Sequence, residues 1–258
     1  MQLPPFSEKR NSMKHIAFFS ALVLCFLSVV EKLPDLFRNG NAVRYSVAWS
    51  VPRKSSPLRG KTILFLGSSV TCGSAAKGES FADYLAEIDG VNAVKEAVSG
   101  TTLADIGETS YISRMKTIDP SLKADLFLCQ LSTNDASKNI PMGTVSDSFS
   151  KETFDTSTVA GAIEYIIAYA KETWNCPVSF YTGTKYDSAQ YAEMVTLLQT
   201  IAQKWDIAVL DLWNDADMNA VSEKDYAFYM KDSIHPYRAG YKLWWLPKFE
   251  AFLTDILA

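Results

Sequence analysis

Histidine and cysteine are both scarce in this chain of 258 residues, which has two histidines and four cysteines. The cysteines at 25, 72, 129 and 176 are not spaced in pairs such as C-x-x-C that would hold a metal ion. So few cysteines are not expected to form a disulfide framework, and buried free thiols are the default. The cysteine spacing therefore does not indicate a metal site, and we expect no cofactor.

A basic stripe is also missing from most of the chain. Residues 1–60 carry nine Lys and Arg against three Asp and Glu, whereas residues 61–258 carry 16 against 26. The larger part is therefore acidic, which argues against nucleic acid as a partner. The basic part surrounds an apolar segment, as in membrane-targeting sequences.

That apolar segment, residues 16–30, has no charged residue and follows Lys9, Arg10 and Lys14. It is shorter than the roughly 20 residues of a spanning helix and fits the apolar core of a secretion signal. The small-x-small cleavage pattern is absent after it. On these length rules, an uncleaved signal anchor or a secretion signal is favoured over a helix packed on its own domain. We therefore expect an exported or membrane-anchored, extracytoplasmic protein, with residues 1–60 as signal segment and linker.

Residues 61–258 are expected to form one domain, in which short apolar runs alternate with helical patterns. The strands are expected at 62–66, 92–98, 124–131, 177–181 and 207–212, and the helices at 78–88, from about 102 to 115, 159–174, 187–205 and 239–257. This alternation is typical of α/β proteins, with a five-stranded parallel sheet covered by helices on both faces. Asp187 with Gln190 resembles a helix-capping box. The polar stretch 138–156 is interpreted either as a lid or as a mobile surface loop.

The first strand leads into Gly67-Ser68-Ser69-Val70-Thr71, where the glycine permits backbone angles closed to other residues. Ligands of open α/β sheets bind beyond the carboxyl ends of the strands, so Ser69 is a candidate nucleophile. Taken alone, these serines are more typical of a polar turn that caps a helix than of a nucleophile. Because Thr71 occupies the last glycine position of a G-x-S-x-G motif, an α/β-hydrolase is not indicated.

A serine nucleophile needs a base, and His235 is the only histidine of the domain, since His15 adjoins the apolar segment. Asp232 precedes it by three residues and could hold its ring. Stabilisation of an oxyanion requires hydrogen-bond donors. The main-chain N–H of Ser69, that of Gly100 and the side-chain amide of Asn134 follow the first three strands. These donors meet over one crevice if strands two and three flank strand one.

Four blocks of this sequence resemble the SGNH hydrolases, also called the GDSL esterase/lipase family. They are residues 67–71, Ser99-Gly100-Thr101, Ser132-Thr133-Asn134-Asp135 and Asp232-Ser-Ile-His235. The resemblance implies a three-layer α/β/α sandwich of flavodoxin-like fold, with Ser69 as nucleophile and Ser69, Gly100 and Asn134 as oxyanion donors. Ser68 replaces the family's aspartate and Ser132 a glycine, which puts the local turn geometry in question.

The predicted function is a metal-independent serine esterase that hydrolyses acyl esters through an acyl-enzyme. Short acyl groups, among them O-acetyl groups on carbohydrate, are the favoured substrates. Two alternatives stay open: an acyltransferase acting on cell-surface glycans, and a non-catalytic domain that binds glycan or protein. The sequence fixes neither the acyl-chain length nor the oligomeric state.

Overall fold

The computed structural model describes residues 38–257, and a compact unit begins at Gly40. The apolar segment 16–30, with His15 and Cys25, lies outside the described residues, so the signal or anchor stays a prediction. Within the described part of the chain, every helix is too short or too polar to span a bilayer.

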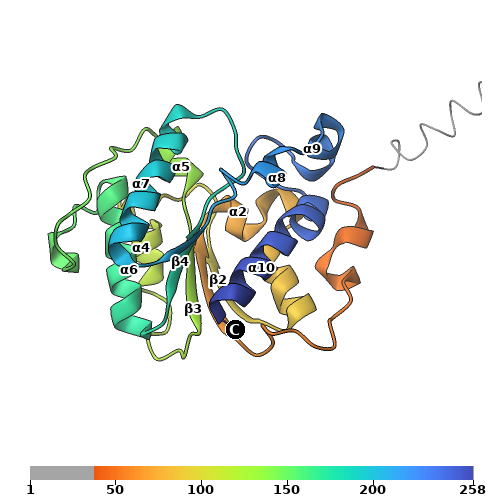
Figure 1. The fold of residues 1–258 in the computed structure, drawn as a ribbon, viewed down its shortest axis with the longest axis horizontal. Helices are drawn as coiled ribbons and strands as arrows, with labels where there is room; N and C mark the ends of the chain where they lie inside the picture. The colour runs from red at the N-terminus through yellow and green to blue at the C-terminus, as the bar shows by residue number, and fades with distance from the viewer. Residues whose placement is uncertain (1–37, 258) are drawn as a thin grey trace, which may run out of the picture. The chain divides into compact units, whose positions relative to one another are not determined.

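Five parallel strands form a single sheet in the order β2-β1-β3-β4-β5 (Figure 1). The strands are β1 (Thr62–Gly67), β2 (Asn92–Ala97), β3 (Leu126–Gln130), β4 (Val178–Tyr181) and β5 (Ala208–Leu210). Each lies within or one residue beyond the range expected from the sequence. The order confirms the α/β fold, and it places β2 and β3 on either side of β1.

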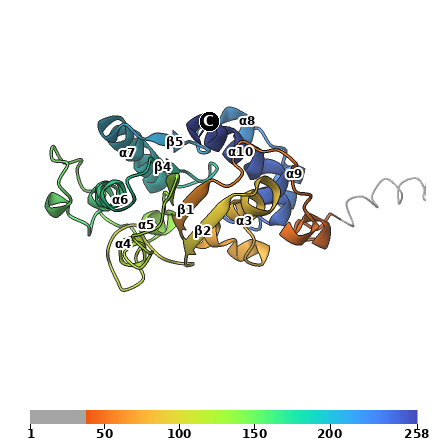
Figure 2. The same ribbon diagram turned by 90° about the horizontal axis from the view of Figure 1, so that it is seen from below.

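Helices cover both faces of the sheet, which confirms the three-layer arrangement (Figures 1 and 2). One face carries α4 (Tyr111–Met115), α6 (Val159–Trp174) and α7 (Ala189–Trp205); the other carries α3 (Phe81–Tyr84), the π-helical turns η4 (Leu85–Asp89) and η6 (Gly240–Trp245), and α10 (Leu246–Leu257).

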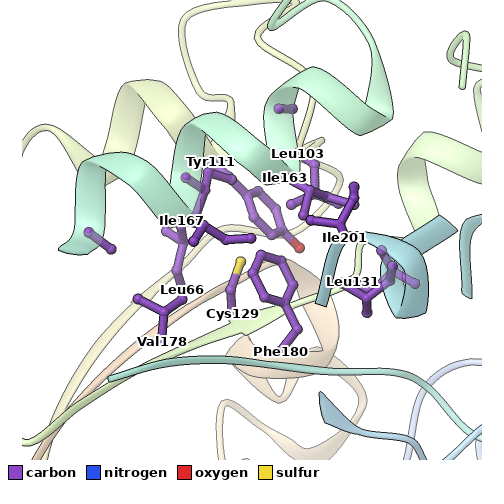
Figure 3. Close-up of a cluster of buried hydrophobic side chains, with 14 of the residues drawn as sticks. Leu66, Leu103, Tyr111, Cys129, Leu131, Ile163, Ile167, Val178, Phe180 and Ile201 are labelled. Atoms are coloured by element: carbon purple, nitrogen blue, oxygen red, sulfur yellow. The ribbon is translucent and has the colours of Figure 1, made fainter. Parts of the chain in front are cut away.

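Alternate strand residues supply the two hydrophobic cores, because successive side chains of a strand point to opposite faces. Leu66, Cys129 and Phe180, from three neighbouring strands, pack towards Ile163 and Ile167 of α6 (Figure 3). The strand residues between them contribute to the second core, under α3 and α10.

Several helix limits differ from the expected ones. The capping box at Asp187 is wrong: α7 begins after Ser188, whose hydroxyl accepts a hydrogen bond from the Tyr191 N–H at 3.2 Å. Gln190 instead donates its side-chain amide to the Ile140 carbonyl oxygen. The helix expected from about residue 102 has only the five residues of α4. The last helix begins with the wider π turns of η6, and regular α-helix starts one residue before Pro247.

Residues 40–60, interpreted as part of a linker, pack on the domain. They contain the 3-10 turns η1 (Val43–Tyr45) and η2 (Val47–Trp49). The hydroxyl of Tyr84 donates a hydrogen bond to the Tyr45 carbonyl oxygen at 2.6 Å, and Leu58 is almost fully buried. Further short elements are η3 (Ser74–Ala76), η5 (Lys151–Thr153), α8 (Ala216–Asn219) and α9 (Glu223–Tyr229).

The polar stretch 138–156 is fastened to α6 and α7 by a buried ion pair. Lys204 of α7 pairs with Glu164 of α6, whose side chain is fully buried. The Lys204 ammonium also donates to the carbonyl oxygens of Ser146 at 2.6 Å and Ser148 at 2.5 Å. These contacts hold the middle of the stretch on the two helices, which argues against a freely mobile loop. Its first residue, Lys138, reaches the candidate site.

Candidate active site

Ser69 is the first residue of the short helix α2 (Ser69–Cys72), directly beyond the end of β1. Its main-chain N–H is at a helix position where N–H groups have no partner inside the helix. Gly67 is not in the left-handed backbone region, so the expected reason for a glycine there is wrong. A Cβ at Gly67 would lie 1.7 Å from the Thr71 hydroxyl, so the glycine is needed for close packing of the turn.

The turn is held from β3 by Gln130, which the sequence did not single out. Its Oε1 accepts hydrogen bonds from the Ser68 N–H at 2.9 Å and from the Thr71 hydroxyl at 2.8 Å. The Tyr181 hydroxyl, from β4, lies 2.6 Å from the same Thr71 hydroxyl. The signal in the sequence is a polar side chain at the end of an otherwise apolar strand.

Ser69, His235 and Asp232 are joined by hydrogen bonds. The Ser69 hydroxyl lies 2.8 Å from His235 Nε2, and His235 Nδ1 lies 2.9 Å from each carboxylate oxygen of Asp232. Because an ionised carboxylate only accepts hydrogen bonds, Nδ1 carries the proton and Nε2 is free to accept that of Ser69. The structure thus brings these three predicted residues together, although they are up to 166 positions apart.

Main-chain hydrogen bonds within the turn hold the Asp232 carboxylate next to the His235 ring. Its Oδ1 accepts the main-chain N–H groups of Ile234 and His235, both at 2.9 Å. Partial burial alone would raise the pKa of Asp232, but these two bonds and the His235 ring outweigh burial and lower it below the ordinary value of 3.8. Ionised Asp232 therefore stabilises the folded protein at neutral pH, and this contribution is lost as the pH falls through the lowered pKa.

Gly100 and Asn134 occupy the ends of β2 and β3 on either side of Ser69. Gly100 has a φ of +81°, at which other residues would be strained, and no atom lies within 4 Å of the position where a Cβ would stand. Asn134, in α5 (Thr133–Ser137), is half-buried and donates one amide hydrogen to the Thr101 carbonyl oxygen at 2.9 Å. An amide has two such hydrogens, so the second can be given to a substrate oxygen.

Two basic residues that the sequence reasoning missed hold the loop carrying Gly100. The guanidinium of Arg114, from α4, donates to the Gly67 carbonyl oxygen at 2.8 Å and to the Thr101 hydroxyl at 3.0 Å. Lys138 donates to the Gly100 carbonyl oxygen at 3.0 Å. Arg114 therefore ties the end of β1 to the Gly100 loop, and Asn134 ties the same loop to α5. No local pattern marks either basic residue.

The two departures from the family pattern leave this geometry intact. Ser132 caps α5, because its hydroxyl accepts the Asn134 N–H at 3.1 Å and lies 3.3 Å from the Thr101 carbonyl oxygen. Ser68 is fully buried, with its N–H on Gln130. The last residue of that third block, Asp135, accepts the N–H groups of Leu103 and Ala104. Burial raises the pKa of Asp135 despite these bonds, and its place is structural.

Removing the Asn134 amide tests the donor side of the site. Asn134→Ala is expected to lower kcat by about 10²- to 10³-fold with little change in KM, because an oxyanion is bound only in the transition state. Steady-state hydrolysis of an aryl acetate is the measurement. Asn92→Ala is the control, since that amide also donates to a main-chain oxygen, Gly60 at 3.1 Å, but at the amino end of β2, away from the candidate site. An unchanged kcat would exclude the oxyanion role.

A model of the GDSL-like lipase/acylhydrolase family matches residues 65–243 of this chain. Among curated proteins, no match to this chain was found. Among solved structures, a protein from Lactobacillus plantarum is 20% identical with a TM-score of 0.64, and the match covers 76% of this chain and 98% of that one. A member of the lipolytic G-D-S-L family from Veillonella parvula is 17% identical with a TM-score of 0.53, covering 75% and 97%.

A family two carbohydrate esterase from Clostridium thermocellum, solved in complex with cellohexaose, has a similar fold. It is 16% identical with a TM-score of 0.55, and the match covers 81% of this chain and 67% of that one. At such identities these likenesses concern the fold. Among residues 38–257, no three His, Cys, Asp or Glu side chains are gathered in a way that could hold a metal ion.

Proposed function

Since this chain belongs to the GDSL-like lipase/acylhydrolase family, we propose that it is a serine esterase that hydrolyses acyl esters through an acyl-enzyme. The observation that carries the proposal is the 2.8 Å contact between the Ser69 hydroxyl and His235 Nε2, with Nδ1 held on Asp232. A serine is a weak nucleophile until a neighbouring base takes its proton. This arrangement supplies that base in the required tautomer.

In the first half of the reaction, His235 takes the hydroxyl proton while Ser69 Oγ attacks the acyl carbonyl carbon. The developing oxyanion is bound by the N–H groups of Ser69 and Gly100 and by the Asn134 amide. His235 then gives its proton to the alcohol oxygen, the bond between carbonyl carbon and alcohol breaks, and the acyl group stays on Ser69.

In the second half, a water molecule takes the place of the alcohol. His235 accepts a proton from it, the water oxygen attacks the acyl carbon, and the same donors bind the second oxyanion. When the bond to Ser69 Oγ breaks, the proton returns from His235 to the serine and the free acid leaves. Asp232 stabilises the charged imidazolium in both halves, without being protonated itself.

Short acyl groups, including O-acetyl groups of carbohydrate, are the proposed substrates. The fold shared with a carbohydrate esterase solved with cellohexaose supports the carbohydrate class. An extracytoplasmic position, with residues 16–30 as signal or anchor, would expose the site to cell-surface glycans and is part of the proposal. In that setting an acyltransferase, in which a glycan hydroxyl replaces water, is the second candidate.

A fluorophosphonate probe together with a panel of 4-nitrophenyl esters tests the proposal. The probe is expected to label Ser69, and turnover is expected to fall as the acyl chain lengthens from acetate to octanoate. Product analysis with an added sugar alcohol separates free acid, expected of an esterase, from a transferred ester. If neither labelling nor turnover occurs with any ester, the protein is a binding domain and the esterase proposal fails.

A further inference from the structure

A cavity of about 380 Å³ is lined by residues of α8, α9 and η6, and the last two of these elements flank the turn that carries Asp232 and His235. Lys185 from the loop after β4, Met218 of α8, Glu223 and Tyr226 of α9, and Trp244 of η6 line it. Its volume is within the range of pockets that hold small ligands, and its lining combines apolar and aromatic side chains with a few polar ones, as such pockets do.

The elements that form this cavity also carry the His–Asp turn. The chain leaves α9 at Tyr229, forms the turn containing Asp232 and His235, and enters η6 at Gly240. A β-bridge between Met230 and Pro236 closes the base of that turn. Tyr226 and Trp244 therefore lie on the two elements that flank the turn. Burial, and after it the charge of Asp232, raise the pKa of Tyr226, which is consistent with a position near that carboxylate.

The proposed chemistry requires the alcohol part of an ester to lie on the His235 side. His235 must reach the alcohol oxygen to protonate it, whereas the oxyanion donors stand at the ends of β1, β2 and β3. The cavity is lined by other segments, namely those that follow β4 and β5, and by α9 and η6, the two elements that flank the His–Asp turn. It is therefore placed to receive the alcohol part rather than the carbonyl oxygen.

The lining indicates what kind of alcohol fits. Trp244 stacks on Tyr229, with ring centroids 5.5 Å apart and an interplanar angle of 17°, and it meets Tyr226 edge to face at 6.3 Å. The indole is thus held in place as a flat apolar wall. Lys185 and Glu223, which are both exposed, put charges of opposite sign on the rim. Such a pair favours a neutral ligand with hydroxyl groups over an anion or a cation.

We propose that this cavity binds the alcohol part of the substrate, and that this alcohol is a pyranose ring. A pyranose has an apolar C–H face that can lie on the Trp244 indole, and hydroxyls at its edge that Lys185 and Glu223 can reach. The inference rests on the proposed esterase function and deepens it, because it names the residues that select the alcohol. An acyl chain is the competing occupant.

The test compares esters that share an acetyl group and differ in the alcohol. Acetylated methyl pyranosides of glucose, galactose, xylose and N-acetylglucosamine are set against ethyl acetate, whose alcohol is too small to fill the cavity. Trp244→Ala is expected to lower kcat/KM for the best pyranoside by about 10- to 100-fold, chiefly through KM, and to change that for ethyl acetate less than threefold. Trp49→Ala, an exposed tryptophan outside the cavity lining, is the control.

Three outcomes would overturn the inference. An equal loss on both substrates would mean that Trp244 only supports the turn. No loss on either would mean that the cavity is not used. If Trp244→Ala lowered kcat/KM selectively for hexanoate esters, the cavity would be assigned to the acyl group. Lys185→Ala is a second variant for the case that Trp244→Ala does not fold. It removes an exposed side chain and should not affect folding. It is expected to raise KM for the pyranoside three- to tenfold.

Direct binding separates this inference from the esterase proposal. The unacetylated methyl pyranosides are added to Ser69→Ala protein, and saturation-transfer NMR is recorded. Binding that Trp244→Ala abolishes in this background supports the cavity even if the wild-type protein hydrolyses no ester. If none of the four sugars binds at millimolar concentration, the inference fails while esterase activity can persist.

Discussion

Ser69→Ala is expected to lower kcat for an aryl acetate by about 10⁴- to 10⁶-fold, which is the loss seen when the nucleophile of such a group of residues is removed. The reason is geometric: the Ser69 hydroxyl is the one that lies 2.8 Å from His235 Nε2. The proposed oxyanion donors are main-chain N–H groups and the Asn134 amide, so they remain and are expected to leave a small residual rate. Initial rates and fluorophosphonate labelling are the measurements.

Ser68→Ala is the matched control for this prediction. The two serines are adjacent, but Ser68 is directed to Gln130 through its N–H at 2.9 Å and, more weakly, its hydroxyl at 3.4 Å. Alanine keeps the N–H, so kcat should stay within about tenfold of wild type, given that a weak hydrogen bond contributes roughly 1 kcal/mol. The assignment of Ser69 is contradicted if the Ser69→Ala protein still takes up the probe, or if Ser68→Ala is the variant that loses turnover.

Asp232→Asn is the second large effect, with an expected fall in kcat of about 10²- to 10⁴-fold. An asparagine oxygen can still accept the N–H groups of Ile234 and His235, so the turn should keep its shape. However, an amide can also donate a hydrogen bond to His235 Nδ1, so it does not select the tautomer protonated at Nδ1. In the tautomer protonated at Nε2, that nitrogen cannot accept the serine proton. The lower end of the range applies because the Asp232 side chain is 46% exposed, and water can partly replace it.

Asp119→Asn provides the comparison for this variant. Asp119 is also exposed, also accepts a nearby main-chain N–H, that of Ser121 at 2.8 Å, and also has a lowered pKa through that bond and the Ser121 hydroxyl. It precedes β3, on the side of the amino ends of the strands, whereas the candidate site follows their carboxyl ends, so kcat should change less than twofold. Circular dichroism checks that both variants are folded. Equal activity of Asp232→Asn and wild type would remove Asp232 from the mechanism.

The candidate site is held by two sets of contacts, which belong to different steps of the proposed reaction. The His–Asp turn is local: its carboxylate, two main-chain N–H groups and the imidazole lie within four consecutive residues. The donor side is not local, because Gly100 and Asn134 are positioned by Arg114, Lys138 and the Thr101 main chain. Substitutions in the turn should therefore affect proton transfer, and those around Thr101 should affect oxyanion binding.

The sequence by itself determined the elements that local patterns describe. Apolar runs set the five strands, and the residues that follow them pointed to Ser69, Gly100 and Asn134 at one edge of a parallel sheet. The short spacing of Asp232 and His235 indicated a turn in which the carboxylate reaches the ring. These predictions needed only the period of a strand, the chemistry of the side chains and the rule that parallel strands share a carboxyl edge.

The tertiary structure alone decided what supports those residues and what lies beside them. Gln130 and Arg114 act on the end of β1 across 62 and 47 positions of sequence, and no local pattern shows which main-chain groups they contact. The N-cap of α7 is Ser188 rather than Asp187, because the Ser188 hydroxyl is the side-chain group that accepts the Tyr191 N–H. The Trp244 cavity exists because α8, α9 and η6 meet there, and only packing brings these elements together.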